Sequence, residues 1–212
     1  MNLAFFSESA VDEEALRTLI EAIIGETVQV TLPKFRGRGW KNVIAALPVV
    51  IYQLHYNPVV DGLVVVIDSD SSPLHDQSHP KPARLDTKCR ICKINNRIAF
   101  ARRALKPAAG RTAPLKIAVG LAVPTIESWY LCGRTLQVSE ATWTRGLKGQ
   151  RGVYSKRQLK EQVYGTGLVS FARQKEIAVE HMKRSASELD FFEQQFPLGF
   201  GPLRREVSRW PE

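Results

Sequence analysis

Residues 62–67 read GLVVVI, an apolar run rich in β-branched side chains that ends abruptly at Asp68-Ser69-Asp70. Because the run does not alternate between apolar and polar residues, it predicts a strand that is buried on both faces. Such strands are typical of parallel sheets that helices cover on each side. Three further runs predict the other strands of this sheet, at residues 3–6, 27–32 and 115–123.

Segments with helical spacing lie between these strands, at residues 10–24, 42–55 and 91–106 and again after Pro124. Alternating strands and helices predict the α/β class, here a Rossmannoid parallel sheet of about four strands with helices on both faces. Residues 171–184 and 185–196 predict two more helices. We therefore expect a core at 1–136 and a basic, mostly helical C-terminal extension at 137–212 that packs on it.

The charge balance favours a polyanionic partner. Thirty Lys and Arg residues stand against twenty-one Asp and Glu residues, which gives a net charge of +9. Nucleic acid, either DNA or RNA, is the partner that such an excess favours, and a merely solubilising surface is the alternative.

The few cysteines and the lack of long apolar segments indicate in which cellular compartment the protein resides. Three cysteines in 212 residues do not make a disulfide framework, which favours a reducing cytoplasm. The first residues lack the pattern of a signal peptide, and no stretch reaches the roughly twenty apolar residues of a membrane helix. We expect a cytoplasmic protein without a membrane partner.

Acidic residues follow three of the four predicted strands. They are Glu8, Asp68 with Asp70, and Glu127. Ligands of parallel α/β sheets bind beyond the carboxyl ends of the strands. In an extended segment residues i and i+2 point the same way, so Asp68 and Asp70 are expected to reach one cation. Close carboxylates repel unless a hard divalent ion such as Mg²⁺ or Mn²⁺ neutralises them. A turn or helix cap made by Asp68 is the alternative.

Five segments together resemble a known family. FFSESAVDEEAL resembles the first Toprim motif, in which a strand ends at a glutamate and enters a helix, and VVVIDSDSS resembles its Asp-x-Asp motif. AVPTIESWYL, RGRGWKNVI and RQKEIAVEHM are similar to later segments of a small Toprim-like family. That family is related to the nuclease domain of overcoming-lysogenization-defect proteins. The resemblance extends from about Leu3 to Phe196, and Ser9 stands where the family has a glycine.

The resemblance implies a set of metal ligands. Asp68 and Asp70 would hold the principal metal, and Glu8 would bind metal or position the attacking water. Asp12 would be a ligand of a second metal, and Glu127 would complete the acidic site. The residues alone also allow Asp12 to be an acid that favours the helix dipole, and Glu127 to be a cap after Thr125.

The resemblance further implies catalysis. The expected catalytic residues are Glu8, Asp68, Asp70 and Lys175, the last neutralising the scissile phosphate; an ordinary surface lysine is the alternative for Lys175. The implied function is a nuclease dependent on Mg²⁺ or Mn²⁺ in a bacterial defence system. A non-catalytic nucleic-acid-binding or regulatory subunit partnered with an ATPase is the alternative. A primase-like phosphotransferase is disfavoured, since nothing indicates nucleotide selection.

A second set of candidate metal ligands consists of His75, His79, Cys89 and Cys92. Two cysteines separated by two residues, with two nearby histidines, are the ligand types of a tetrahedral structural Zn²⁺ site. The alternative is a coincidence in which Cys92 merely packs in the core.

Basic and aromatic residues supply candidates for binding nucleic acid. Basic side chains in a flexible loop and on predicted helices could contact a phosphate backbone, or could simply be exposed to solvent. They are Arg36, Arg38, Lys41, Arg102 and Arg103. Trp143 and Tyr154 could stack on bases, although such aromatics are more often part of the core.

Overall fold

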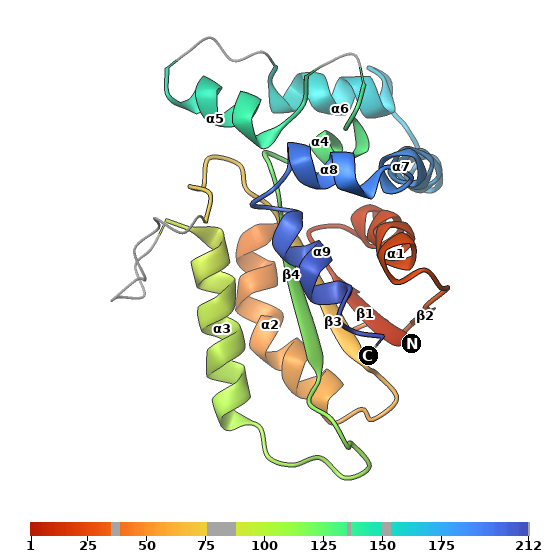
Figure 1. Cartoon of the computed structure of the whole chain (residues 1–212), viewed down its shortest axis with the longest axis vertical. Coiled ribbons are helices and arrows are strands. Elements are labelled where there is room, and N and C mark those ends of the chain that lie inside the picture. The colour runs from red at the N-terminus through yellow and green to blue at the C-terminus, as the bar shows by residue number, and fades with distance from the viewer. Residues whose placement is uncertain (35–38, 76–87, 135–136, 150–153, 212) are drawn as a thin grey trace.

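The computed structural model of the chain describes residues 1–34, 39–75, 88–134, 137–149 and 154–211, which form a parallel sheet covered by helices (Figure 1). Its strands are β1 (Asn2–Phe6), β2 (Gln29–Val30), β3 (Gly62–Asp68) and β4 (Lys116–Ala122). They pair in the order β2-β1-β3-β4, and every pair is parallel. The predicted α/β class and the four-stranded parallel sheet are confirmed.

The central strand β3 separates two hydrophobic cores, which explains why its sequence does not alternate. Leu63, Val65 and Ile67 face α2 (Trp40–His55) and α3 (Arg90–Ala104). Val64 and Val66 face α1 (Ala10–Ile24) and the C-terminal helices on the other side of the sheet. All five side chains are at most 2% exposed. A polar residue on either face would be buried without a partner, so both faces select apolar side chains.

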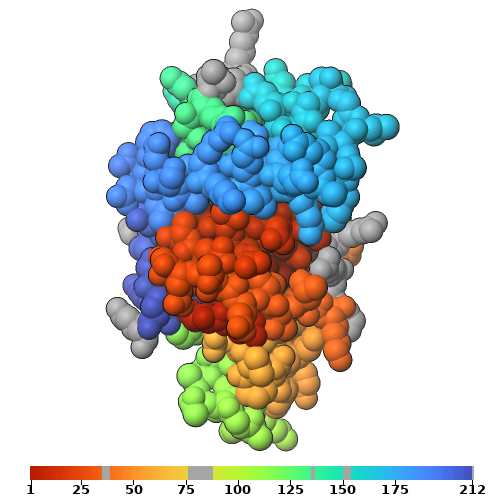
Figure 2. Space-filling model, turned by 90° about the vertical axis from the view of Figure 1, so that its right-hand side faces the viewer, coloured from red at the N-terminus to blue at the C-terminus, as the bar shows by residue number. Residues whose placement is uncertain are grey.

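The C-terminal half adds six helices within the described ranges. They are α4 (Ile126–Tyr130), α5 (Glu140–Leu147), α6 (Lys156–Tyr164), α7 (Phe171–Ala186), α8 (Leu189–Gln195) and α9 (Gly201–Val207). The helices α4 to α8 gather at one end of the sheet, and α9 returns alongside β4 (Figure 1). Figure 2 shows α7 in blue directly above α1 in red, and these two helices pack against each other.

Aromatic packing joins the extension to the sheet. The Trp129 ring lies 5.6 Å from the ring of Phe192 and 5.8 Å from that of Phe200, centroid to centroid. All three residues belong to the same buried cluster as the side chains on one face of β3 and β4, which are Val64, Val66, Ala118 and Ala122. The extension at 137–212 is therefore packed on the core through shared hydrophobic contacts.

The start of α1 sets the position of two acidic residues. The Ser9 hydroxyl accepts hydrogen bonds from the backbone N–H groups of Val11 (3.2 Å) and Asp12 (3.4 Å), which is an N-cap. Ser9, the departure from the Toprim-like motif, thus begins the helix. Glu8 consequently lies just before α1, and Asp12 lies in its first turn.

Several boundaries differ from the sequence-based prediction. The strand expected at 27–32 is reduced to two residues at the edge of the sheet, where both are exposed. The helix α2 starts at Trp40 and continues through Pro48. The helices α5, α6 and α9 were not predicted. Among the helices that the structure describes, not one combines the length and apolar character needed to cross a lipid bilayer.

Gly199 lies where the segment between α8 and α9 meets β4. Its carbonyl accepts the N–H of Leu121 (3.1 Å), and its own N–H donates to Glu140 Oε1 (2.6 Å). A Cβ atom at this position would lie 2.0 Å from the backbone oxygen of Leu121, which belongs to β4 and has no room to move. Only glycine permits this approach.

Replacing Gly199 by alanine is therefore expected to lower the free energy of unfolding by about 3 kcal/mol or more, because the added methyl group forces the backbone apart. The control is Gly167→Ala, where a Cβ meets no atom within 4 Å, and a change within about 0.5 kcal/mol is expected. Urea denaturation of both variants measures the difference. Equal losses of stability would contradict the close approach of Gly199 to β4.

Candidate active site

A pocket of about 390 Å³ lies at the carboxyl end of the sheet. Four carboxylates line it: Glu8, Asp12, Asp68 and Glu127. Glu8 follows β1, Asp68 ends β3, Asp12 is in the first turn of α1 and Glu127 is in α4. The parallel strands thus bring together acids that lie up to 119 residues apart in the sequence, from Glu8 to Glu127. We call this site the acidic pocket.

Hydrogen bonds hold the carboxylates in place. Glu8 Oε1 accepts the backbone N–H of Asp68 (2.9 Å), and Asp68 Oδ1 accepts the N–H of Ile126 at the start of α4 (3.0 Å). Asp12 Oδ1 accepts the hydroxyl of Tyr130 (3.3 Å). Each bond joins two different elements, so the carboxylates also fix β1, β3, α1 and α4 relative to one another.

The acidic pocket is electrostatically strained. Burial raises the pKa of Asp68 well above its usual range, and repulsion from Glu8, Glu127 and Asp12 raises it further. Burial, followed by repulsion from Glu127, raises the pKa of Asp12 to about 7. For both residues burial is the largest cause of the raised pKa, and repulsion between the carboxylates adds to it.

Asp70 faces a different environment from Asp68. Its backbone has a φ of 47°, in the left-handed region, so the chain is no longer extended there. Its carboxylate pairs with Arg90 and Lys156 and is not among the groups lining the acidic pocket. The expectation that Asp68 and Asp70 point the same way is therefore wrong, because the chain turns between them.

Cationic residues that the sequence did not single out stand beside the carboxylates. The Arg90 guanidinium donates to the backbone oxygen of Asp68 and lies 4.3 Å above the Trp40 ring. Lys160 Nζ is 3.9 Å from Glu127 Oε1, and its side chain is 61% exposed. Lys156 and Lys160 are four residues apart on α6, a spacing that places them on one helical face and that could have identified them.

Lys175, the lysine implied by the family resemblance, lies elsewhere. It lines a separate pocket with Phe5, Glu13 and Arg17, and its Nζ is 5.5 Å from the centre of the Phe171 ring. The preceding residue, Gln174, lines the acidic pocket instead. The structure thus places Lys160, and not Lys175, among the carboxylates.

The predicted nucleic-acid contacts are spread over the molecule. Lys41 is exposed beside Trp40, near Arg90. Arg102 and Arg103 are exposed in the last turn of α3, about 20 Å along that helix from Arg90. The predicted Arg36 and Arg38 lie outside the described residues.

The two aromatic candidates for base stacking pack against each other. The rings of Trp143 and Tyr154 are stacked with centroids 6.0 Å apart. Tyr154 is 5% exposed and donates its hydroxyl to the backbone oxygen of Ser139. The core interpretation therefore fits Tyr154 better than base stacking does.

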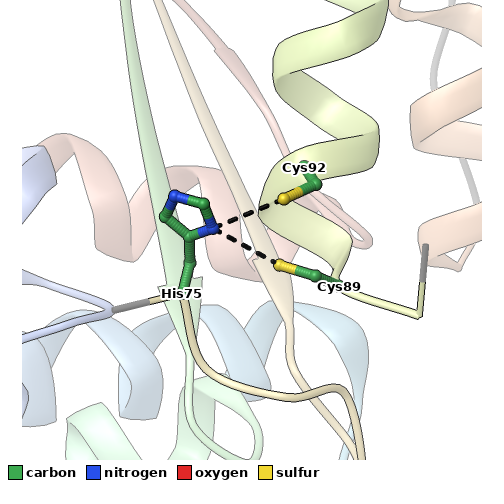
Figure 3. Close-up of side chains that lie close together, drawn as sticks. All are labelled: His75, Cys89 and Cys92. Carbon is green, nitrogen blue, oxygen red and sulfur yellow. Dashed lines mark hydrogen bonds between the residues drawn. The ribbon is translucent and has the colours of Figure 1, made fainter. Parts of the chain in front are cut away.

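Three of the four predicted zinc ligands come together. His75 Nδ1 lies 3.8 Å from Cys89 Sγ and 3.4 Å from Cys92 Sγ (Figure 3). In the described ranges, this is the one group of three His, Cys, Asp or Glu residues whose ligand atoms all lie within 4.8 Å of one another. The fourth predicted ligand, His79, lies outside the described residues.

Comparisons with protein-family models, with curated proteins and with solved structures found no match to this chain. The chemistry of the acidic pocket and the resemblance of the sequence motifs are therefore the indications of function.

The strain in the acidic pocket predicts how Asp68→Asn behaves without metal. The pKa of Asp68 is higher in the folded protein than in the unfolded chain, where it is about 3.9. Protonated Asp68 therefore contributes stability below about pH 3.9, and this contribution is lost as the pH rises through the pKa of the folded protein. Asparagine is neutral and can still accept the Ile126 N–H. Asp68→Asn should therefore raise the melting temperature at pH 8 and change it little at pH 4, each kcal/mol corresponding to about 2–4 °C.

Thermal melts in chelator-treated buffer measure this effect. Asp190→Asn is the matched control, since Asp190 is an exposed acid paired with Arg204, and it should show no gain at pH 8. A lower melting temperature for Asp68→Asn at pH 8 would show that the Asp68 charge is compensated in the folded protein.

Proposed function

We propose that the chain is a metal-dependent nuclease that hydrolyses phosphodiester bonds of DNA or RNA at the acidic pocket. The observation that carries this proposal is the convergence of four buried or half-buried carboxylates at the carboxyl end of a parallel sheet. The pKa values of two of them are raised, which is the condition that a bound cation would relieve. The Toprim-like motifs include these four residues, and they also include Asp70 and Lys175, which do not line the pocket.

The donor atoms fit a hard divalent cation. Carboxylate oxygens are the ligands that Mg²⁺ and Mn²⁺ prefer, and Glu8 and Asp68 would be the principal ones. The carboxylate oxygens are not as tightly clustered as the atoms around His75. A cation bound there would therefore be held by one or two of these carboxylates together with water, as Mg²⁺ commonly is. When bound, the metal would stabilise charge on the phosphate and lower the pKa of a bound water.

The remaining residues of the pocket have roles that follow from their charge. Asp12 and Glu127 add negative charge that strengthens cation binding. Lys160, with its exposed end beside Glu127, is placed to bind a phosphate oxygen of the substrate. The Tyr164 hydroxyl is available as a neutral donor, because burial raises its pKa. Asp70 does not act on the metal in this proposal; it forms ion pairs with Arg90 and Lys156.

Cleavage assays test the proposal directly. Labelled single-stranded and double-stranded DNA and RNA are incubated with the wild-type protein and Mg²⁺ or Mn²⁺. Asp68→Asn is expected to reduce the cleavage rate by about 10²-fold or more, since the metal contributes several kcal/mol to the transition state. Asp190→Asn should cleave at the wild-type rate.

Metal binding is measured separately by the melting temperature. Mn²⁺ should raise that of the wild type and of Asp190→Asn, and should have a much smaller effect on Asp68→Asn. Normal cleavage by Asp68→Asn would refute the proposal. Tight binding of nucleic acid without cleavage would favour the alternative, a regulatory subunit that works with an ATPase.

Lys160 and Lys175 give a test between the structure and the family resemblance. If Lys160 contacts a phosphate, Lys160→Ala should weaken nucleic-acid binding and reduce the slope of log affinity against log salt by about one. Lys175→Ala should leave both quantities near the wild-type values. Fluorescence anisotropy at several salt concentrations measures this. The reverse result would show that Lys175, as the resemblance implies, is the phosphate contact.

A further inference from the structure

We propose that His75, Cys89 and Cys92 bind a structural Zn²⁺ ion that joins the loop after β3 to the start of α3. This site is separate from the acidic pocket, and the proposal does not depend on nuclease activity. Figure 3 shows the imidazole directed at both sulfur atoms. Cys89 caps α3, and Cys92 lies in its first turn. The loop and the helix thus approach each other through all three side chains.

The distances match those of a tetrahedral zinc centre. Typical Zn–S and Zn–N bonds of about 2.3 and 2.05 Å at a tetrahedral angle place sulfur and nitrogen about 3.6 Å apart. The two observed S···N separations are 3.4 and 3.8 Å, on either side of this value. The third separation, between the sulfurs, is also within 4.8 Å. An ion can therefore be placed among the three atoms with little movement.

Hydrogen bonding alone accounts for this arrangement less well. His75 Nδ1 has either one lone pair or one proton in the plane of the ring, and so it makes one good hydrogen bond. Both sulfurs nevertheless approach this one nitrogen. A cation bound by all three atoms explains both contacts. Sulfur and imidazole donors select Zn²⁺ over Mg²⁺ or Mn²⁺, which prefer oxygen.

The burial of the two cysteines also supports a zinc site. Cys89 is 0% and Cys92 4% exposed, and none of the three cysteines, all of which the structure describes, forms a disulfide. Buried cysteines often serve as small apolar residues. Here, however, a polar ring nitrogen is directed at them, which packing alone does not require.

The zinc site would also position Arg90, which contacts Asp68 of the acidic pocket. Arg90 lies between the two cysteines in the sequence CRIC, and its N–H donates to the Ser72 hydroxyl (3.0 Å). Its guanidinium reaches the Asp68 backbone oxygen and the Asp70 carboxylate. An ion that fixes the first turn of α3 would thereby fix Arg90 beside Asp68 and Asp70.

The first test is the metal content of the wild-type chain, produced without a polyhistidine tag and purified under reducing conditions. Mass spectrometry of the metals should find about one zinc per chain. X-ray absorption at the zinc edge should find two sulfur ligands. His75→Asn and Cys92→Ser should each lose most of the zinc. Cys132→Ser, which changes the cysteine outside the cluster, and Asp68→Asn, in the acidic pocket, should retain it.

Chelation provides a measurement that does not depend on the variants folding. Removing zinc from the wild type should lower its melting temperature, and adding Zn²⁺, but not Mg²⁺, should restore it. Three results would overturn the proposal: less than about 0.1 zinc per chain after growth with zinc, full zinc content in His75→Asn, or an unchanged melting temperature after chelation. A Cys89–Cys92 disulfide in the protein as purified would overturn it as well.

Discussion

The burial of Asp68 among other carboxylates at the end of β3 is the constraint around which the site is organised. Five apolar residues place β3 in the middle of the molecule, and Asp68 follows them at the point where the strand leaves the core. Its backbone N–H donates to Glu8, and one of its carboxylate oxygens accepts a hydrogen bond from the start of α4. Burial and repulsion between these carboxylates destabilise the fold, and the two hydrophobic cores supply the stability that offsets this cost.

Asp68 and Asp70 show how two nearby carboxylates acquire different chemistry. Asp70 meets Arg90 and Lys156, so its charge is compensated within the protein. No ion pair of the described residues includes Asp68, and repulsion from three other carboxylates raises its pKa, which attraction to Lys156 offsets only in part. Compensated charge stabilises structure, whereas uncompensated charge attracts a ligand of opposite sign. This difference is why the proposed metal site is assigned to Asp68 and its neighbours.

Periodicity was sufficient to predict the sheet, because β1, β3 and β4 are buried on the faces that their apolar residues require. The same reasoning placed Glu8, Asp68 and Glu127 at one edge, since parallel strands end together. The direction of Asp70 was not predictable, because its positive φ is set by contacts with α3 and α6. That Lys160, and not Lys175, lies beside the carboxylates was not predictable for a similar reason. The helix α6 is polar and has only two buried residues, so its position depends on the packing of distant segments.

The two proposed metal sites differ in their donor atoms, and this difference would let each select its own ion. The acidic pocket offers oxygen atoms, which favour Mg²⁺ or Mn²⁺, whereas the cluster of His75, Cys89 and Cys92 offers sulfur and nitrogen, which favour Zn²⁺. Arg90 connects them, since it lies between the two cysteines and contacts both Asp68 and Asp70. A structural ion bound to the two cysteines would reduce the motion of this arginine. Ordering Arg90 before substrate binds lowers the entropy lost on binding, which is the general advantage of a preorganised site.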